Sequence, residues 1–170
     1  LIFISSLAAY GPADYQKDQI LDKHATPHPN TWYGESKLQA EQFISSYGNI
    51  PSLIFRPTAV YGPRDTDFVT VYKTIKSGIE PKIGLGNQFL SFIYVKDLAT
   101  LVIKSLSSEH RNKAYFVSDG DIYPSFTYNA FIKEIFDKKT LKVTIPVSIL
   151  RIAATINQWI GRITGNYPIL

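Results

Sequence analysis

Tyr33 and Lys37 are the two residues whose types and spacing are best suited to proton transfer. They lie four positions apart in the run Tyr-Gly-Glu-Ser-Lys, and residues four apart on a helix share one face. A free tyrosine has a pKa of about 10, and a cation held close to it favours the phenolate and lowers that pKa. An enzyme that moves a hydroxyl proton while a hydride leaves the same carbon needs such a base. We therefore predict that this pair is a catalytic base and its modulating cation.

The segment before Tyr33 distinguishes it from Tyr72, which also has a lysine four residues later. The apolar run at residues 1–4 is typical of a strand that is buried on both faces of a parallel sheet. Ser5 and Ser6 follow it directly, and open α/β sheets bind ligands at the carboxyl ends of their strands. Because no comparable strand and hydroxyl precede Tyr72, we expect Tyr33 to be the functional tyrosine.

Alternating strand and helix patterns surround this pair. A helix from about 33 to 47, with Leu38, Phe43 and Ile44 near one side, separates the first strand from a second buried strand at 52–55. This order predicts a right-handed crossover and a parallel sheet. Further strands are expected at 81–83, 89–94, 114–118 and 142–145, and further helices at 67–75, at 98–106, from Ser125 or Thr127, and from Pro146.

Motifs that occur in a fixed order carry a resemblance to a known family. They are the first strand with its two serines and Ala-x-Tyr-Gly, then Tyr-Gly-x-Ser-Lys, Arg-Pro-Thr-Ala-Val-Tyr-Gly-Pro at 56–63 and Phe-Ile-Tyr-Val-Lys-Asp-Leu-Ala at 92–99. Over residues 1 to about 145 the sequence resembles the extended short-chain dehydrogenase/reductase family, the NAD-dependent epimerase/dehydratases. The resemblance implies an α/β fold, with part of a Rossmann-like doubly wound parallel sheet and a smaller mixed α/β substrate-binding region.

The resemblance also implies how the chain is divided. Residues 1–62 and about 88–106 are expected to form the carboxyl-terminal part of the dinucleotide-binding Rossmann domain, and residues 63–87 and 107–170 an incomplete substrate-binding region. The glycine-rich phosphate loop of the family has no match, since the close glycines at 84 and 86 lack a strand-to-helix setting and indicate a turn. We therefore expect a carboxyl-terminal piece of a longer enzyme, inactive by itself.

The family's functional residues can be transferred to matching positions. Tyr33 would be the base/acid, Lys37 would lower its pKa and hold the ribose of NAD or NADP, and Ser6 would orient the substrate. An alternative for Ser6 is that its hydroxyl only bonds to nearby backbone at the strand end. The residues expected to contact the cofactor are Ser5, Tyr33, Lys37 and Pro57. Those expected to contact the substrate are Ser6, Ala8 and Tyr61.

Departures from the family pattern leave the substrate open. Leu7 and Ala8 stand where sugar dehydratases carry Asp-Glu, so dehydration is not expected. Leu90 stands where nucleotide-sugar epimerases usually carry an arginine that binds the diphosphate. The first interpretation is an NAD(P)-dependent epimerase or oxidoreductase of a sugar-like, possibly nucleotide-sugar, substrate. The alternatives are a reductase similar to 3β-hydroxysteroid dehydrogenases that acts on an apolar alcohol or ketone, and a non-catalytic NAD(P)-sensing or partner-binding relative.

Composition argues against several other classes of protein. The sequence has no cysteine, so it offers neither disulfides nor thiolate metal ligands, and prolines flank His28 and prevent a helical metal site with His24. The net charge is +4, but the lysines are scattered rather than clustered as in nucleic-acid-binding proteins. The apolar region 145–163 contains too many polar residues to cross a membrane. We expect no metal, no nucleic acid and no membrane, but a cytoplasmic enzyme of small molecules, with a homodimer implied by the resemblance.

Overall fold

The protein divides into two compact units. A computed structural model describes residues 1–12, 21, 24–84, 86, 88–146 and 148–149. Unit 1 comprises Leu1–Asp65 and Leu90–Ile122, and unit 2 comprises Thr66–Phe89 and Tyr123–Leu170. Within the described residues, no helix has the length and apolar character that a membrane crossing requires.

A parallel sheet forms the centre of unit 1. Its strands β1 (Ile2–Ile4), β2 (Leu53–Pro57) and β7 (Lys113–Val117) are arranged in the order β1-β2-β7. Ile4 lies opposite Phe55, and Pro57 lies opposite Val117. Parallel strands end at one edge, so the serines after β1 and the end of β2 lie together at the carboxyl edge of the sheet. The predicted parallel sheet and α/β class are confirmed.

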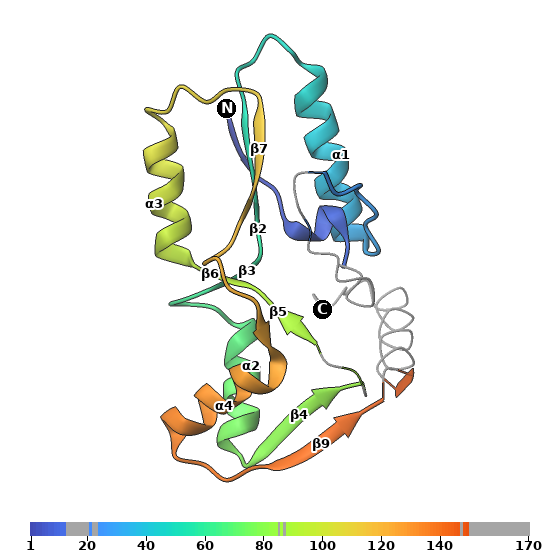
Figure 1. Cartoon of the computed structure of the whole chain (residues 1–170), viewed down its shortest axis with the longest axis vertical. Helices are drawn as coiled ribbons and strands as arrows, with labels where there is room; N and C mark the ends of the chain where they lie inside the picture. The colour runs from blue at the N-terminus through green and yellow to red at the C-terminus, as the bar shows by residue number, and fades with distance from the viewer. Residues whose placement is uncertain (13–20, 22–23, 85, 87, 147, 150–170) are drawn as a thin grey trace, which may run out of the picture. The chain divides into compact units, whose positions relative to one another are not determined.

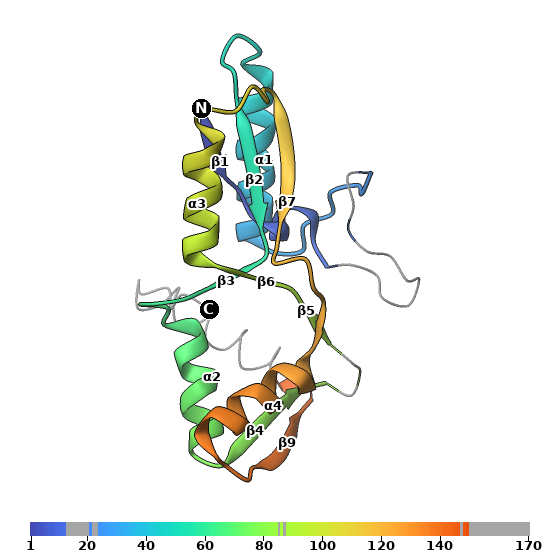
Figure 2. The same ribbon diagram turned by 60° about the vertical axis from the view of Figure 1, so that its left-hand side comes forward.

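Two helices cover the two faces of this sheet, α1 (Trp32–Ser46) on one side and α3 (Val95–Ser105) on the other (Figures 1 and 2). Alternate strand residues point to opposite faces. Leu53, Phe55 and Val117 are buried in a cluster against which side chains of α3 pack. The intervening residue Arg56 instead contacts α1. The sheet is therefore apolar toward α3 and partly polar toward α1.

The burial of β1 and of α1 differs from the prediction. β1 is an edge strand of this sheet and its Ile4 is exposed, so it is not buried on both faces within the described residues. Helix α1 has almost the predicted bounds, but Phe43 is 64% exposed and contacts Tyr47. The helix buries Gly34 and Glu41 instead. No apolar stripe marks this face, because its central residue is the charged Glu41. The partner of Glu41 is Arg56, which lies on β2.

The segment between the motifs at 56 and 92 also holds unpredicted structure. Strand β3 (Ala59–Tyr61) pairs in parallel with β6 (Phe92–Tyr94), although we expected a loop after Pro57. The strand expected at 89–94 is divided into β5 (Phe89–Leu90) and β6. Helix α3 begins at Val95 with Tyr94 as its N-cap residue, so the predicted start at residue 98, with Asp97 as the N-cap, is wrong.

Unit 2 contains helices and strands of its own. They are α2 (Asp67–Lys76), β4 (Ile79–Ile83), β8 (Tyr123–Pro124), α4 (Ser125–Phe136) and β9 (Leu141–Ile145). β4 and β9 pair in parallel, and Ile75 and Ile132 are buried. The sequence suggests Asp67 as the N-cap residue of α2, but Thr66 occupies that position. The helix predicted from Pro146 lies outside the described residues.

The boundary between the units differs from the expected one. We assigned residues 107–170 to the substrate-binding region, whereas residues 107–122 belong to unit 1. The reason is strand β7, which pairs with β2 over its whole length. The functional roles of the two units remain predictions.

Glu80 of β4 is a buried carboxylate that joins separate elements of unit 2. It is 4% exposed, and it accepts hydrogen bonds from Lys133 of α4 at 2.8 Å and from Thr140 at 3.0 Å. Burial by itself would raise the pKa of Glu80, but these two bonds and the charges of Lys133 and Lys142 outweigh it, so the pKa is held below its ordinary value of 4.5. The ionised form is therefore stabilised in the folded protein.

We predict that Glu80→Gln lowers the free energy of unfolding at neutral pH by about 1–3 kcal/mol, because Lys133 loses its charged partner. A lowered pKa in the folded state gives stability that is complete above the ordinary value of 4.5 and is lost as the pH falls through the folded value. The difference in the free energy of unfolding between wild type and Glu80→Gln, measured by urea titration, should therefore shrink as the pH falls below 4.5. Glu134→Gln on the exposed side of α4 is the control and should change stability little. The prediction would be contradicted if the free energies of unfolding of wild type and Glu80→Gln differed by the same amount at neutral and at acidic pH.

Candidate active site

The candidate site lies at the carboxyl edge of the sheet in unit 1. The backbone N–H of Ser5 donates to the carbonyl of Phe55 at 2.7 Å, which continues the pairing of β1 and β2 by one residue. After Ser5 the chain leaves the sheet, and the short 3-10 helix η1 (Leu7–Tyr10) follows. Ser6 is therefore the point at which strand becomes helix.

Ser6 acts as the N-cap of η1. Its backbone is extended, and its hydroxyl oxygen accepts a hydrogen bond from the N–H of Ala8 at 3.1 Å. This is the local backbone contact that the alternative interpretation of Ser6 expected. A hydroxyl that accepts one bond still has its own proton to donate and a second lone pair, so the contact is compatible with a substrate bond.

Gly34 allows helix α1 to approach η1 closely. A Cβ at this position would lie against the carbonyl oxygen of Ala8, far inside van der Waals distance, and 3.2 Å from the Cβ of Pro29. The hydroxyl of Thr31 caps the helix by accepting a bond from the Gly34 N–H at 3.0 Å. The glycine after Tyr33 therefore has a steric role, which brings the first turn of α1 against the segment that follows β1.

Lys37 connects α1 to the end of β1. Its ammonium donates to the carbonyl oxygen of Ile4 at 3.1 Å and lies 5.7 Å from the centre of the Tyr33 ring and 5.2 Å from that of Phe3. An ammonium has three N–H donors, so further donors remain for a ligand. Tyr33 is 56% exposed. The predicted pair therefore lies side by side at the sheet edge, with the tyrosine open to solvent.

The competing pair lies in unit 2, on α2. The ring of Tyr72 is stacked on Phe68 at 6.4 Å, and the ammonium of Lys76 lies 5.8 Å from the centre of the Phe136 ring. Both tyrosines therefore have a lysine on the same helix face, but Tyr33 lies on the helix that contacts the end of β1.

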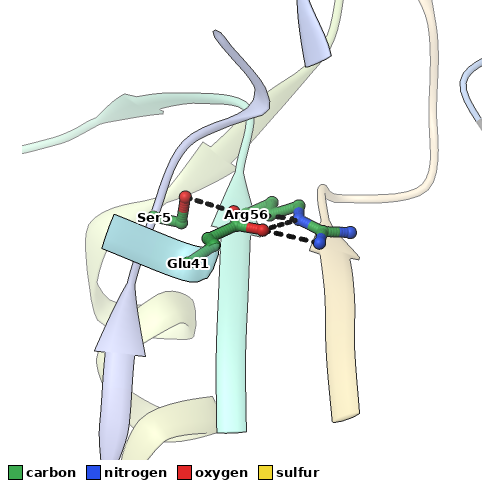
Figure 3. A network of polar contacts seen from close by, with 3 residues as sticks. All are labelled: Ser5, Glu41 and Arg56. Atoms are coloured by element: carbon green, nitrogen blue, oxygen red, sulfur yellow. Dashed lines mark hydrogen bonds and ion pairs between the residues drawn. The ribbon is translucent and has the colours of Figure 1, made fainter. Parts of the chain in front are cut away.

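A buried polar network under the site was not anticipated from the sequence. Figure 3 shows its members, Ser5 after β1, Glu41 of α1 and Arg56 of β2. The Ser5 hydroxyl donates to Glu41 Oε1 at 2.5 Å, and Arg56 donates to Glu41 Oε2 from Nε at 3.0 Å and from Nη2 at 2.6 Å. The spacing of Glu41, four residues after Lys37, could have indicated that it faces the sheet.

The other predicted contact residues lie on several elements of unit 1. Ser5 is buried and its hydroxyl is engaged with Glu41. Pro57 is the last residue of β2 and is buried, and Ala8 lies in η1 next to Gly34. Tyr61 lies on β3, with its ring centre 5.4 Å from that of Tyr94. The structure brings Ser6, Ala8, Tyr33 and Lys37 to the end of β1, and the ligand contacts of all these residues remain predictions.

The histidines between the strand and α1 have other partners. The two ring nitrogens of His28 lie 3.0 Å from the carbonyl oxygen of Thr26 and 3.1 Å from that of Pro12. Among the described residues, there is no group of three or more histidine, cysteine or acidic side chains that could hold a metal ion.

Known proteins with a similar sequence provide an independent comparison. The sequence model of the NAD dependent epimerase/dehydratase family matches residues 1–118. The spore coat polysaccharide biosynthesis protein SpsK of Bacillus subtilis (strain 168) is 34% identical over 125 residues, which cover 73% of this chain and 41% of that protein. The uncharacterized UDP-glucose epimerase YtcB of the same organism is 28% identical over 116 residues, which cover 64% of this chain and 35% of YtcB.

The fold is also found in solved structures. The crystal structure of UDP-glucuronic acid 4-epimerase from Bacillus cereus, in complex with NAD, superposes with a TM-score of 0.76 at 22% identity. The superposition covers 85% of this chain and 49% of that one. At this identity the similarity concerns the fold alone. The chain spans less than half the length of each of these proteins.

We predict that Gly34→Ala destabilises unit 1 even though helix propensity favours alanine by about 1 kcal/mol. The new methyl group would collide with backbone at Ala8, which a rotamer change cannot relieve. Differential scanning calorimetry should show a lower melting temperature. Gly48→Ala is the matched control, because a Cβ there meets nothing within 4 Å. A Gly34→Ala variant as stable as the wild type would show that the contact of α1 with η1 is loose.

Proposed function

Because this chain belongs to the NAD-dependent epimerase/dehydratase family, we propose that the whole protein is an NAD- or NADP-dependent epimerase of a nucleotide sugar. The family resemblance predicted from the sequence motifs is confirmed by the same matches. The names of the two Bacillus subtilis relatives, a UDP-glucose epimerase and a polysaccharide biosynthesis protein, support a sugar substrate. They do not favour the alternatives of an apolar alcohol or of a non-catalytic role.

One observation carries the proposal for the reacting groups. Lys37 donates a hydrogen bond to the carbonyl of Ile4, the last residue of β1, and lies beside the ring of Tyr33. The candidate proton-transfer residues therefore lie next to the end of a strand, and all three residues belong to the part of the chain that matches the family. These residues fit the reacting end of a nicotinamide cofactor, because Tyr33 is exposed and the ammonium of Lys37 has donors to spare for ribose hydroxyls. Bound NAD or NADP would supply hydride transfer.

The residues of the site have separate tasks in the proposed reaction. Tyr33 takes the proton from a sugar hydroxyl as that carbon is oxidised to a ketone, and it returns the proton when the ketone is reduced from the opposite face. Ser6 donates its hydroxyl proton to the same substrate oxygen and fixes its position. Lys37, whose ammonium lies beside the Tyr33 ring, donates its remaining N–H bonds to the ribose hydroxyls of the cofactor.

Tyr33→Phe in the whole protein should lower turnover by about 100-fold or more, because the proton-transfer group is lost while the ring remains. Stability should change little, since the Tyr33 side chain is largely exposed. Tyr72→Phe is the control, as this tyrosine also has a lysine four residues later but lies on α2. Equal losses of turnover in the two variants would refute the assignment of Tyr33.

The type of reaction can be measured on the same preparation. An epimerase returns the hydride to its substrate, so the near-ultraviolet absorbance of the reduced nicotinamide should not accumulate while the sugar product forms. Product would be followed by chromatography with UDP-glucose as the first substrate tested. Reduced nicotinamide formed in proportion to product would instead identify a dehydrogenase.

A further inference from the structure

Glu41 is the most deeply buried acidic side chain of unit 1 that the structure describes, and it lies in the middle of helix α1. It is 4% exposed. An ionised carboxylate in such a place is strongly unfavourable unless hydrogen bonds and an opposite charge replace its water. Ser5 and Arg56 provide both, and they come from two different parts of the sheet edge.

Arg56 is itself held from several sides. Its guanidinium makes a bidentate contact with Glu41, with the two side chains 12% and 5% exposed. Its carbon Cζ lies 4.3 Å from the ring centre of Tyr10 and 5.2 Å from that of Phe116. These two rings meet edge to face at 4.9 Å. The network therefore connects α1 with η1, β2 and β7.

The network lies directly beside both halves of the proposed active site. Ser5 immediately precedes Ser6, and Glu41 lies one helical turn beyond Lys37 and about two turns beyond Tyr33. A displacement of Ser5 would move Ser6, and a displacement of Glu41 would move the helix that carries the tyrosine and lysine. Catalysis is sensitive to such displacements, since a shift of about 1 Å can cost 100-fold in rate.

We propose that Glu41 is a positioning residue for the proposed reaction, which fixes helix α1 against the end of β1 through Ser5 and against β2 through Arg56. The proposal rests on the proposed function of Tyr33, Lys37 and Ser6. It assigns to Glu41 no contact with substrate or cofactor, and it predicts a loss of turnover that a control variant with a similar loss of stability does not show.

The test compares variants at opposite edges of the same sheet in the whole protein. Glu41→Gln preserves the shape of the side chain but removes its charge, and Ser5→Ala removes only the hydroxyl. The matched control is Asn112→Ala, because the Asn112 side chain accepts a bond from the Ser52 N–H at 3.1 Å at the amino end of β2, away from the site. All three variants lose polar contacts of the same sheet.

We expect kcat to fall about 10- to 100-fold in Glu41→Gln and by a smaller factor in Ser5→Ala, with KM for the cofactor changed less than about threefold. Asn112→Ala should lower the melting temperature but leave kcat within about twofold of wild type. The double variant Ser5→Ala/Glu41→Gln should be no slower than Glu41→Gln, because both residues act through one contact. The proposal would be overturned if Asn112→Ala lost as much turnover as Glu41→Gln for the same loss of melting temperature, because turnover would then follow stability alone.

Hydrogen exchange provides a readout that does not depend on activity. In Glu41→Gln and Ser5→Ala the backbone amides of residues 5–10 and 32–37 should exchange faster than in wild type, whereas Asn112→Ala should accelerate exchange around residues 52 and 112. If wild type lacks epimerase activity, the proposed function fails, but the exchange pattern still decides whether Glu41 fixes the site. Unchanged exchange at residues 5–10 in both Glu41→Gln and Ser5→Ala would overturn the positioning role. Ser5→Ala keeps the test available if Glu41→Gln does not fold.

Discussion

The buried carboxylate of Glu41 determines how the end of β1, strand β2 and helix α1 meet. Burial removes water from the carboxylate, and this is tolerated only where polar partners replace it. Ser5 and Arg56 replace it from two strands, at 2.5 Å and 2.6–3.0 Å. Because each partner belongs to a different element, the carboxylate is satisfied only when all three elements take their observed positions. A nonspecific apolar contact would allow the helix to slide along the sheet, whereas this bidentate contact does not.

The small size of Gly34 acts together with the polar contacts of Glu41 in placing helix α1. Gly34 and Glu41 are seven residues apart, about two turns, and so lie on nearly the same face of α1. The glycine lets the first turn of the helix come against Ala8, and the glutamate holds the third turn against Ser5 and Arg56. Lys37 lies between them and bonds to Ile4. Lys37 is thus carried on a segment that is fixed on both sides of it, and Tyr33 directly precedes the fixed residue Gly34.

The parts of the structure that local patterns determine could be predicted from the sequence. The apolar runs of β1 and β2 and the helix between them predicted the parallel pairing, and the spacing of Tyr33 and Lys37 predicted that the two lie on one face of α1. An apolar stripe does not predict the buried face of α1, because Glu41 is buried through a partner fifteen residues away. The signal that was overlooked is the spacing of Glu41, four residues after Lys37. Strand β3 was missed because its hydrogen-bonding partner β6 lies about thirty residues later and Pro57 suggested an end to the strand.

The two units contain similar polar contacts whose consequences differ with their place. Glu80 in unit 2 also combines a buried carboxylate, a cation and a hydroxyl, as Glu41 does in unit 1. The contacts of Glu80 join β4 to α4 and to the residue before β9, so their loss affects chiefly the stability of unit 2. The contacts of Glu41 lie at the carboxyl edge of parallel strands, where α/β enzymes bind their ligands. Similar chemistry therefore supports folding in one place and the geometry of the proposed reaction in the other, and the position of each carboxylate relative to the strand ends accounts for this difference in role.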